Sequence, residues 1–199
     1  MKIFYTHDYS ANRGESHRLL AHAIGLYLNE RERGAELAGS LLKERSGKPY
    51  IEGFAGFSIS HSNNTWALLI GDGPCGLDVQ YPKKCDILSI AQRFYNKDDA
   101  DLIMSAAGSC NDKSADKASQ DPEAAELFFR VWARREALIK AAGTTVAAED
   151  IPAVMSDTAD YEGAAWRLTD ICVPGAEDLF AAVCVRQEEP ESEIEYIEI

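Results

Sequence analysis

Hydrophobic and polar residues follow two different periods along this chain, which predicts a protein of mixed helices and strands. Apolar residues recur at helical spacing in five segments, and these are predicted to form helices: 15–28, 34–43, 86–94, 98–106 and 123–142. Strands are predicted where short runs are apolar or alternate with period two: 3–5, 57–61, 65–70, 76–80, 166–173 and 179–185. Two further segments are predicted to be a mobile surface loop (108–122) and either an edge strand or a mobile end (194–199).

The segment 76–80 is the most informative of the predicted strands. It follows a glycine-rich turn and is expected to return alongside the strand before that turn. Because side chains alternate along a strand, Leu77 and Val79 are predicted to lie on one face, and Asp78 and Gln80 on the other. The polar face therefore carries a carboxylate that is available for a functional site.

The order of these elements predicts an α+β fold. A strand, a helix and several strands are followed by helices and strands again, which suggests two similar halves, each a small antiparallel sheet with packed helices. No sequence repeat is visible, so the residues themselves do not show a duplication. We place the N-terminal half at residues 1–80 and the C-terminal half at 81–199, and expect the two to form one functional unit.

Composition and charge narrow the class of protein. The formal net charge of −13 argues against nonspecific nucleic-acid binding, which depends on Lys and Arg that neutralise phosphates. No apolar run approaches the roughly 20 residues that span a bilayer, and the first residues lack the apolar stretch of a signal peptide. The five cysteines are scattered without a Cys-x-x-Cys pair, so no disulfide framework or zinc site is indicated. We expect a cytoplasmic protein without membrane or nucleic-acid partners.

Positive charge is nevertheless concentrated in two segments. Four basic residues follow the 76–80 strand, and four more lie within the predicted helix 123–142. These are Lys83, Lys84, Arg93 and Lys97, and then Arg130, Arg134, Arg135 and Lys140. An acidic protein with this distribution is expected to present a local basic face to an anionic partner.

Asp78, Glu136 and Lys140 are the candidates for chemistry. Glu136 and Lys140 stand one helical turn apart, and a magnesium ion takes oxygen ligands from elements that are distant in sequence. Phosphate transfer also needs a nearby cation where negative charge develops. The alternative is a solvated helical ion pair worth about 0.2–0.5 kcal/mol. Trp132, one turn earlier on the same face, favours a buried face or a cleft instead.

Lys48, Ser60 and His61 are candidates for binding phosphate. Hydroxyls and imidazole nitrogens both donate hydrogen bonds, so Ser60 and His61 together are plausible phosphate donors. The alternatives are a structural histidine at a strand end and, for Lys48 between a glycine and a proline, a residue of a turn.

Several motifs together resemble the Sfp-type 4′-phosphopantetheinyl transferase family over residues 16–185. Two shorter pieces, 90–95 and 180–184, also look like this family. The four motifs occur in the family's order: Gly47-Lys48-Pro49, Phe57-Ser58-Ile59-Ser60-His61-Ser62, Gly76-Leu77-Asp78-Val79 and Trp132-x-x-x-Glu136-Ala137-x-x-Lys140.

The resemblance implies an activity and a fold. Such enzymes transfer phosphopantetheine from coenzyme A to a serine of an apo carrier protein, release adenosine 3′,5′-bisphosphate and use Mg²⁺. Their fold is a pseudodimer of two α+β halves with coenzyme A in the cleft between them. Residues 1–80 would then be the coenzyme A side and residues 81–199 would carry the catalytic helix. A monomer is expected.

The resemblance also implies roles for individual residues. Asp78 and Glu136 would be metal ligands, with Gln80 where many relatives carry a further acidic ligand. Glu136 and Lys140 would be catalytic, since Lys140 would contact the phosphates and Glu136 could also deprotonate the carrier serine. The nucleotide site would be lined by Arg18, Lys48, Ser60 and His61.

This chain departs from the family pattern in three places. Gln80 replaces an acid, Arg135 replaces the lysine that commonly precedes the glutamate, and the segment before Arg18 lacks the lysines that hold the 3′-phosphate in relatives. Two alternatives therefore stay open. One is a catalytically weak homologue that binds coenzyme A or a carrier protein, and the other is a magnesium-dependent phosphoesterase.

Overall fold

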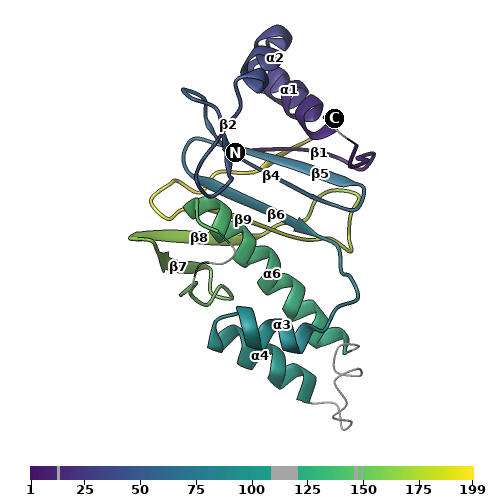
Figure 1. Ribbon diagram of the computed structural model, residues 1–199, viewed down its shortest axis with the longest axis vertical. Coiled ribbons are helices and arrows are strands. Elements are labelled where there is room, and N and C mark those ends of the chain that lie inside the picture. The colour runs from purple at the N-terminus through teal and green to yellow at the C-terminus, as the bar shows by residue number, and fades with distance from the viewer. Residues whose placement is uncertain (13, 109–120, 146–147, 149) are drawn as a thin grey trace.

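A computed structural model describes residues 1–12, 14–108, 121–145, 148 and 150–199 (Figure 1). Within these residues the helices are α1 (Glu15–Leu28), α2 (Arg31–Gly39), α3 (Ile87–Phe94), α4 (Lys97–Gly108) and α6 (Pro122–Ala142). The strands are β1 (Lys2–Thr6), β2 (Leu42–Lys43), β3 (Pro49–Tyr50), β4 (Gly56–Ser62), β5 (Thr65–Gly71), β6 (Cys75–Gln80), β7 (Thr158–Tyr161), β8 (Ala164–Asp170), β9 (Phe180–Arg186) and β10 (Glu195–Glu198). The loop predicted over 108–122 lies, apart from its ends, outside the described residues.

The strands form two four-stranded sheets and one small hairpin. The first sheet has the order β10-β1-β5-β4, the second has the order β6-β9-β8-β7, and β2 pairs with β3. The predicted α+β class is confirmed. The second sheet is antiparallel throughout, whereas the first is mixed, because β10 runs parallel to β1. That the two halves are related as a pseudodimer stays a prediction.

The two sheets lie face to face between two layers of helices (Figure 1). Ile3 and Leu69 of the first sheet meet Leu77 and Val183 of the second in the core between the sheets. The outer face of the first sheet packs against α1, the outer face of the second packs against α6, and α3 and α4 pack against α6 on the side away from the sheet. The predicted faces of the 76–80 strand are confirmed, since Leu77 and Val79 are buried in the core between the sheets.

Several local predictions are corrected by the structure. β6 does not return beside β5 but pairs with β9, because its apolar face covers the core that the second sheet shares with the first. The helix predicted over 34–43 ends at Gly39, and residues 42–43 form β2 instead. For the segment 194–199, the first of the two predicted alternatives is confirmed, since β10 is an edge strand of the first sheet. The division at residue 80 stays a prediction, although β6, which precedes it, belongs to the second sheet.

α6 is the helix that carries the candidate catalytic residues, and both of its ends are well defined. The Asp121 side chain accepts hydrogen bonds from the backbone N–H groups of Glu123 and Ala124, and Pro122 occupies the first turn, where a missing N–H costs nothing. Gly143 ends the helix with φ 68°, a conformation that glycine adopts without strain. Its buried residues lie against β6, β9 and β8.

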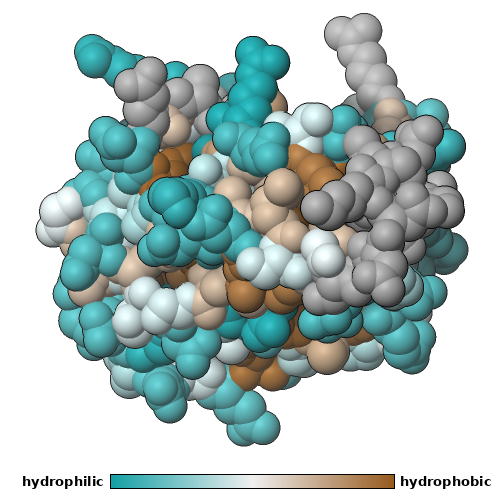
Figure 2. All heavy atoms as spheres, turned by 90° about the horizontal axis from the view of Figure 1, so that it is seen from below, coloured by the Kyte–Doolittle hydropathy of each residue, from teal (hydrophilic) through white to brown (hydrophobic). Residues whose placement is uncertain are grey.

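No helix in the described part of the chain is both long and apolar enough to cross a membrane. Figure 2 views the molecule from the end that carries α3 and α4, where hydrophobic surface (brown) lies in recesses between hydrophilic side chains (teal). Phe94 of α3 and Leu102 of α4 are both exposed.

Candidate active site

α6 crosses β6 at Gly76, and this crossing creates the site. A Cβ atom at Gly76 would lie 2.6 Å from the backbone nitrogen of Ala141, closer than any side chain tolerates. Since glycine has no Cβ, the helix approaches the strand closely enough for residues one turn apart on α6 to reach Asp78. A glycine inside a predicted strand signals such an approach, but the sequence does not say what approaches.

Asp78 forms an ion pair with Lys140 at the junction of the two elements. Lys140 Nζ lies 2.7 Å from Asp78 Oδ1, and the hydroxyl of Ser60 donates to the same oxygen at 2.8 Å. The Asp78 side chain is only 9% exposed and that of Lys140 is 26% exposed. The structure therefore brings together three of the predicted site residues from β4, β6 and α6.

The Lys140 ammonium has three acceptors in the protein. Besides Asp78 Oδ1, it donates to the backbone oxygen of Leu77 at 3.0 Å and to Ser60 Oγ at 3.1 Å. An ammonium has three N–H groups, so all of its donors are used. Contact with a phosphate, the predicted role of Lys140, would require it to give up or share at least one of these bonds.

Glu136 lies one turn before Lys140 and is partly buried. Burial raises the pKa of the Glu136 carboxyl above its ordinary value, the nearby charge of Asp78 raises it further, and the positive charges of Lys140 and Arg135 partly oppose this. Asp78 Oδ2 is buried and has no hydrogen-bond partner. Two carboxylates therefore lie near each other with an oxygen left unsatisfied.

Glu136 lines two different cavities. One has a volume of about 310 Å³ and is bordered by polar groups that include Lys48, Ser58, Lys140 and Thr144. The other has a volume of about 320 Å³ and a mostly apolar wall, made of Ile90, Phe94, Tyr95, Trp132, Arg135 and Glu136. The prediction that Trp132 marks a cleft agrees with its place in this wall. Tyr95, for which the sequence predicts no role of its own, stacks on Phe128 beside the cavity.

The remaining predicted residues occupy different places. Lys48 Nζ donates to the backbone oxygen of Cys75 at 3.1 Å and borders the polar cavity. Gln80 turns its amide nitrogen to the backbone oxygen of Tyr81 at 2.6 Å. His61 is exposed, and its ring packs 5.0 Å from that of Tyr9.

Arg18 and His61 lie apart from the Asp78 centre. Arg18 is on an exposed face of α1, with its side chain 70% exposed and 3.5 Å from Glu15. His61 alternates with Ser60 along β4, so its side chain lies on the α1 side of the first sheet. Their predicted contacts with coenzyme A stay predictions.

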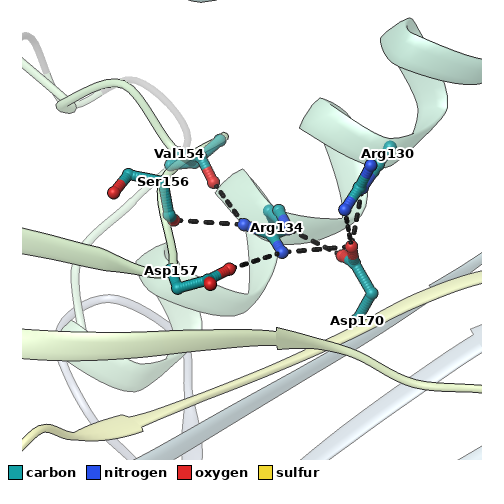
Figure 3. Close-up of polar contacts among 6 residues, drawn as sticks. All are labelled: Arg130, Arg134, Val154, Ser156, Asp157 and Asp170. Carbon is teal, nitrogen blue, oxygen red and sulfur yellow. Dashed lines mark hydrogen bonds and ion pairs between the residues drawn. The ribbon is translucent and has the colours of Figure 1, made fainter.

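The basic residues of α6 do not form one basic face, which corrects the expectation from the sequence. Figure 3 shows Arg130 and Arg134, which both turn towards Asp170. Arg134 is buried and binds Asp170 through two nitrogens, at 2.6 and 3.0 Å. It also donates to the backbone oxygens of Val154 and Ser156. Arg130 binds the same Asp170. These arginines fasten α6 to β8 and to the segment before β7, because a buried guanidinium requires paired charge.

Among the described residues, no three or more His, Cys, Asp or Glu side chains gather in a way that could hold a metal ion by themselves. The groups here that could offer oxygen ligands to a metal are the carboxylates of Asp78 and Glu136 and the amide of Gln80. Magnesium is often held by one or two carboxylates together with substrate phosphates rather than by a complete protein cage.

The region around Asp78 and α6 matches a known family. Residues 74–169 fit the model of the 4′-phosphopantetheinyl transferase superfamily. This segment belongs to the 4′-phosphopantetheinyl transferase superfamily. The Sfp-type resemblance predicted from the motifs is thereby confirmed. The superfamily segment contains Asp78, Gln80, Glu136 and Lys140, whereas Arg18, Lys48, Ser60 and His61 lie outside it.

Two curated transferases are similar to half of the chain. The 4′-phosphopantetheinyl transferase psf-1 of Bacillus pumilus is 31% identical over 103 residues, 50% of this chain and 38% of that protein. The 4′-phosphopantetheinyl transferase gsp of Aneurinibacillus migulanus is 29% identical over 101 residues, 51% of this chain and 37% of that protein. The matched region thus spans less than two fifths of the length of either relative.

Proposed function

We propose that this protein transfers the 4′-phosphopantetheine group of coenzyme A to a serine of an apo carrier protein and releases adenosine 3′,5′-bisphosphate. One observation carries the proposal: the superfamily segment contains Asp78, Glu136 and Lys140, and these residues come together where α6 crosses β6. The similarity to two 4′-phosphopantetheinyl transferases supports the same reaction.

The reaction makes three demands on the site. The serine oxygen of the carrier forms a bond to the phosphorus that bears pantetheine, and the bond from that phosphorus to the adenylate side breaks. The leaving phosphate gains negative charge, the serine loses a proton, and both partners must be held in line. A cationic group, a base and two adjoining binding spaces are therefore needed.

Glu136 borders both cavities, which supports a role for it between the two substrates. The polar cavity beside Lys48 and Lys140 suits the diphosphate of coenzyme A, and the apolar cavity beside Trp132 opens on the other side of Glu136. Because the pKa of Glu136 is raised, its carboxylate accepts a proton more readily than an exposed glutamate does. Glu136 is the base that we assign to the carrier serine, directly or through a water.

The residues present fit a magnesium ion that is shared with the substrate. The buried oxygen Asp78 Oδ2 lacks a partner, the Glu136 carboxyl lies close enough for the charge of Asp78 to raise its pKa, and Gln80 follows Asp78 two positions later on the same face of β6. These three residues would hold the ion. When bound, magnesium would neutralise the charge of the diphosphate and of the leaving group. Lys140 holds Asp78 in place through its contact with Oδ1.

The carrier would approach the end of the molecule that carries α3. Four basic residues lie there or just before it, and Lys83 Nζ is placed 5.4 Å from the ring centroid of Trp132. Acidic carriers would be attracted to this region, although the chain as a whole is acidic. We expect the enzyme to act as a cytoplasmic monomer.

The test is a transfer assay with coenzyme A, Mg²⁺ and a panel of apo carriers from fatty-acid, polyketide and peptide synthesis. A mass gain equal to phosphopantetheine on the carrier serine is expected with the wild type. Asp78→Ala should fold and lose transfer. Asp78→Asn, which keeps the shape of the side chain, should also lose transfer and separates loss of charge from loss of packing.

Other outcomes would select the alternatives. Binding of coenzyme A or carrier without any mass gain indicates a catalytically weak homologue. Release of phosphate products without carrier modification indicates a phosphoesterase. Near wild-type transfer by both Asp78 variants would overturn the assignment of Asp78 to the metal.

A further inference from the structure

Three buried serines on β4 hold the backbone of β6 at the place where the two sheets meet. β4 and β6 are edge strands of different sheets and do not pair with each other through their backbones. Alternate N–H groups of β6 and of Tyr81, the residue after it, are instead bound by serine hydroxyls. Leu77 N donates to Ser58 Oγ at 3.0 Å, Val79 N to Ser60 Oγ at 3.2 Å, and Tyr81 N to Ser62 Oγ at 2.9 Å. We call Ser58, Ser60 and Ser62 the serine ladder.

Ser60 differs from the other two members of the ladder because it also contacts charged groups. Its hydroxyl accepts from Lys140 Nζ at 3.1 Å and lies 2.8 Å from Asp78 Oδ1. A hydroxyl offers one donor and two lone pairs. The Val79 N–H and the ammonium can only donate, so they occupy both lone pairs, and the hydroxyl proton is left for Asp78. The hydrogen-bonding capacity of Ser60 is then complete.

This bonding fixes which oxygen of Asp78 is available. Ser60 and Lys140 both engage Oδ1, and Oδ2 remains buried without a hydrogen-bond partner. Without the Ser60 hydroxyl, one fewer bond would distinguish the two oxygens, and the carboxylate could turn about its terminal torsion, which has a broad range. Metal affinity depends on such neighbours that orient a ligating carboxylate.

We propose that Ser60 is a positioning residue for Asp78 and not a ligand of a coenzyme A phosphate. This inference rests on the proposed function. A phosphate contact would require Ser60 to release Asp78, Lys140 or the Val79 N–H. If Ser60 belongs to the nucleotide site, as predicted from the sequence, its loss should weaken coenzyme A binding. If Ser60 positions Asp78, its loss should weaken metal binding.

Ser58→Ala is the matched control for Ser60→Ala. Both substitutions remove a buried hydroxyl that accepts one N–H of β6, but Ser58 has no contact with Asp78. Mn²⁺ binding is measured from the loss of the free-ion electron paramagnetic resonance signal, with the protein alone and with coenzyme A, against a blank of coenzyme A without protein. Urea unfolding gives the stability of each variant, and KM for coenzyme A is measured at saturating Mg²⁺.

Both variants are expected to lose stability, and Ser60→Ala more than Ser58→Ala, because it also loses hydrogen bonds to two charged groups. Only Ser60→Ala is expected to weaken Mn²⁺ binding, by roughly 10–100-fold. The KM of Ser60→Ala for coenzyme A at saturating Mg²⁺ should match that of the wild type, which is the reference here because Ser58 borders the cavity assigned to the diphosphate. Ser60→Thr keeps a hydroxyl and should restore Mn²⁺ binding. If Ser60→Ala does not fold, Ser60→Cys keeps the volume with a weaker donor and should give the same weakening.

The inference is overturned if Ser60→Ala, or Ser60→Cys in its place, binds Mn²⁺ as Ser58→Ala does, or raises only the KM for coenzyme A. A wild type that binds no Mn²⁺ also overturns it. The proposed function fails separately, if the wild type binds Mn²⁺ but modifies no apo carrier.

Discussion

Gly76 lies under the backbone oxygen of Ala137, and an added Cβ atom at this glycine would be 1.9 Å from that oxygen. Gly76→Ala would therefore push α6 away from β6 and separate Lys140 from Asp78. We expect a loss of stability of about 1–3 kcal/mol or more, as for other overpacked sites, and loss of transfer. Urea unfolding and the transfer assay measure the two effects.

Gly39→Ala is the control for this change, because a Cβ atom at Gly39 meets nothing within 4 Å. It should leave transfer unchanged. If Gly76→Ala is as stable as the wild type, α6 and β6 do not approach each other as closely as in this structure.

The raised pKa of Glu136 predicts a pH dependence of stability. Burial and the Asp78 charge raise the pKa above the ordinary value of 4.5 in the folded protein. A raised folded-state pKa gives stability that is fully present below the unfolded value and is lost as pH rises through the folded value. Compared with Glu136→Gln, the metal-free wild type should lose stability as the pH rises above the ordinary value of 4.5. If the free energies of unfolding of the two proteins, measured with urea, change with pH in the same way, the raised pKa of Glu136 is contradicted.

Gln80→Glu should lower the Mg²⁺ concentration for half-maximal transfer, because a charged oxygen is a stronger ligand for a hard cation. The substitution removes the hydrogen bond from the Gln80 amide nitrogen to the Tyr81 backbone oxygen, so the free energy of unfolding should fall by about 1 kcal/mol. Asn63→Asp, on the turn between β4 and β5, adds the same charge outside β6 and is the control. An unchanged Mg²⁺ requirement in Gln80→Glu would mean that this side chain does not reach the ion.

Reversing charge at Lys83 and Lys84 should raise the KM for an acidic carrier at low salt and leave the KM for coenzyme A nearly unchanged. Salt should raise the wild-type carrier KM in the same way, since exposed charges are screened over about 8–10 Å at physiological ionic strength. Arg31→Glu with Arg33→Glu, on α2 at the opposite side of the molecule, makes the matched control (Figure 1). Equal effects of the two pairs would exclude docking at Lys83 and Lys84.

Removal of residues 194–199 should destabilise the first sheet. Ile197 and Ile199 pack on the core beneath α1, and Ile199 N donates to Tyr5 O. Their loss would leave β1 as an exposed edge that is able to pair with other chains. We expect a lower melting temperature and aggregation on heating, measured by light scattering. Glu195→Gln with Glu198→Gln keeps the strand and should behave like the wild type.

The hydrophobic periods were sufficient to predict the helices that carry a buried stripe and the faces of β6. Leu77 and Val79 are buried as their alternation indicates, since a strand has only two faces. The pairing of β6 with β9 could not be predicted. The alternation of apolar and polar residues shows which face of β6 is buried, but not to which of the two sheets the strand belongs. β7 was missed, although Glu162 and Gly163, both with positive φ, form a tight turn to β8.

The candidate site was predictable only as a set of residue types. The i, i+4 spacing of Glu136 and Lys140 places both on one face of α6, but the burial of Arg134 and its bonds to Asp170 arise from tertiary packing. The same limit applies to Ser60, whose partners lie 18 and 80 positions away in the sequence. A pattern of serines along a strand does not reveal whether their hydroxyls face a ligand or a neighbouring strand.

The parallel pairing of β1 with β10 has a consequence for the order of folding. During synthesis on a ribosome, β1 emerges before the other described elements, and its partner β10 emerges after them. Contacts between segments so far apart in sequence close slowly. The first sheet can assemble β1, β5 and β4 early, but one border of β1 stays open until β10 arrives. We therefore expect a late folding phase in which β10 is added, and an interval before it in which chaperones have an open strand to protect.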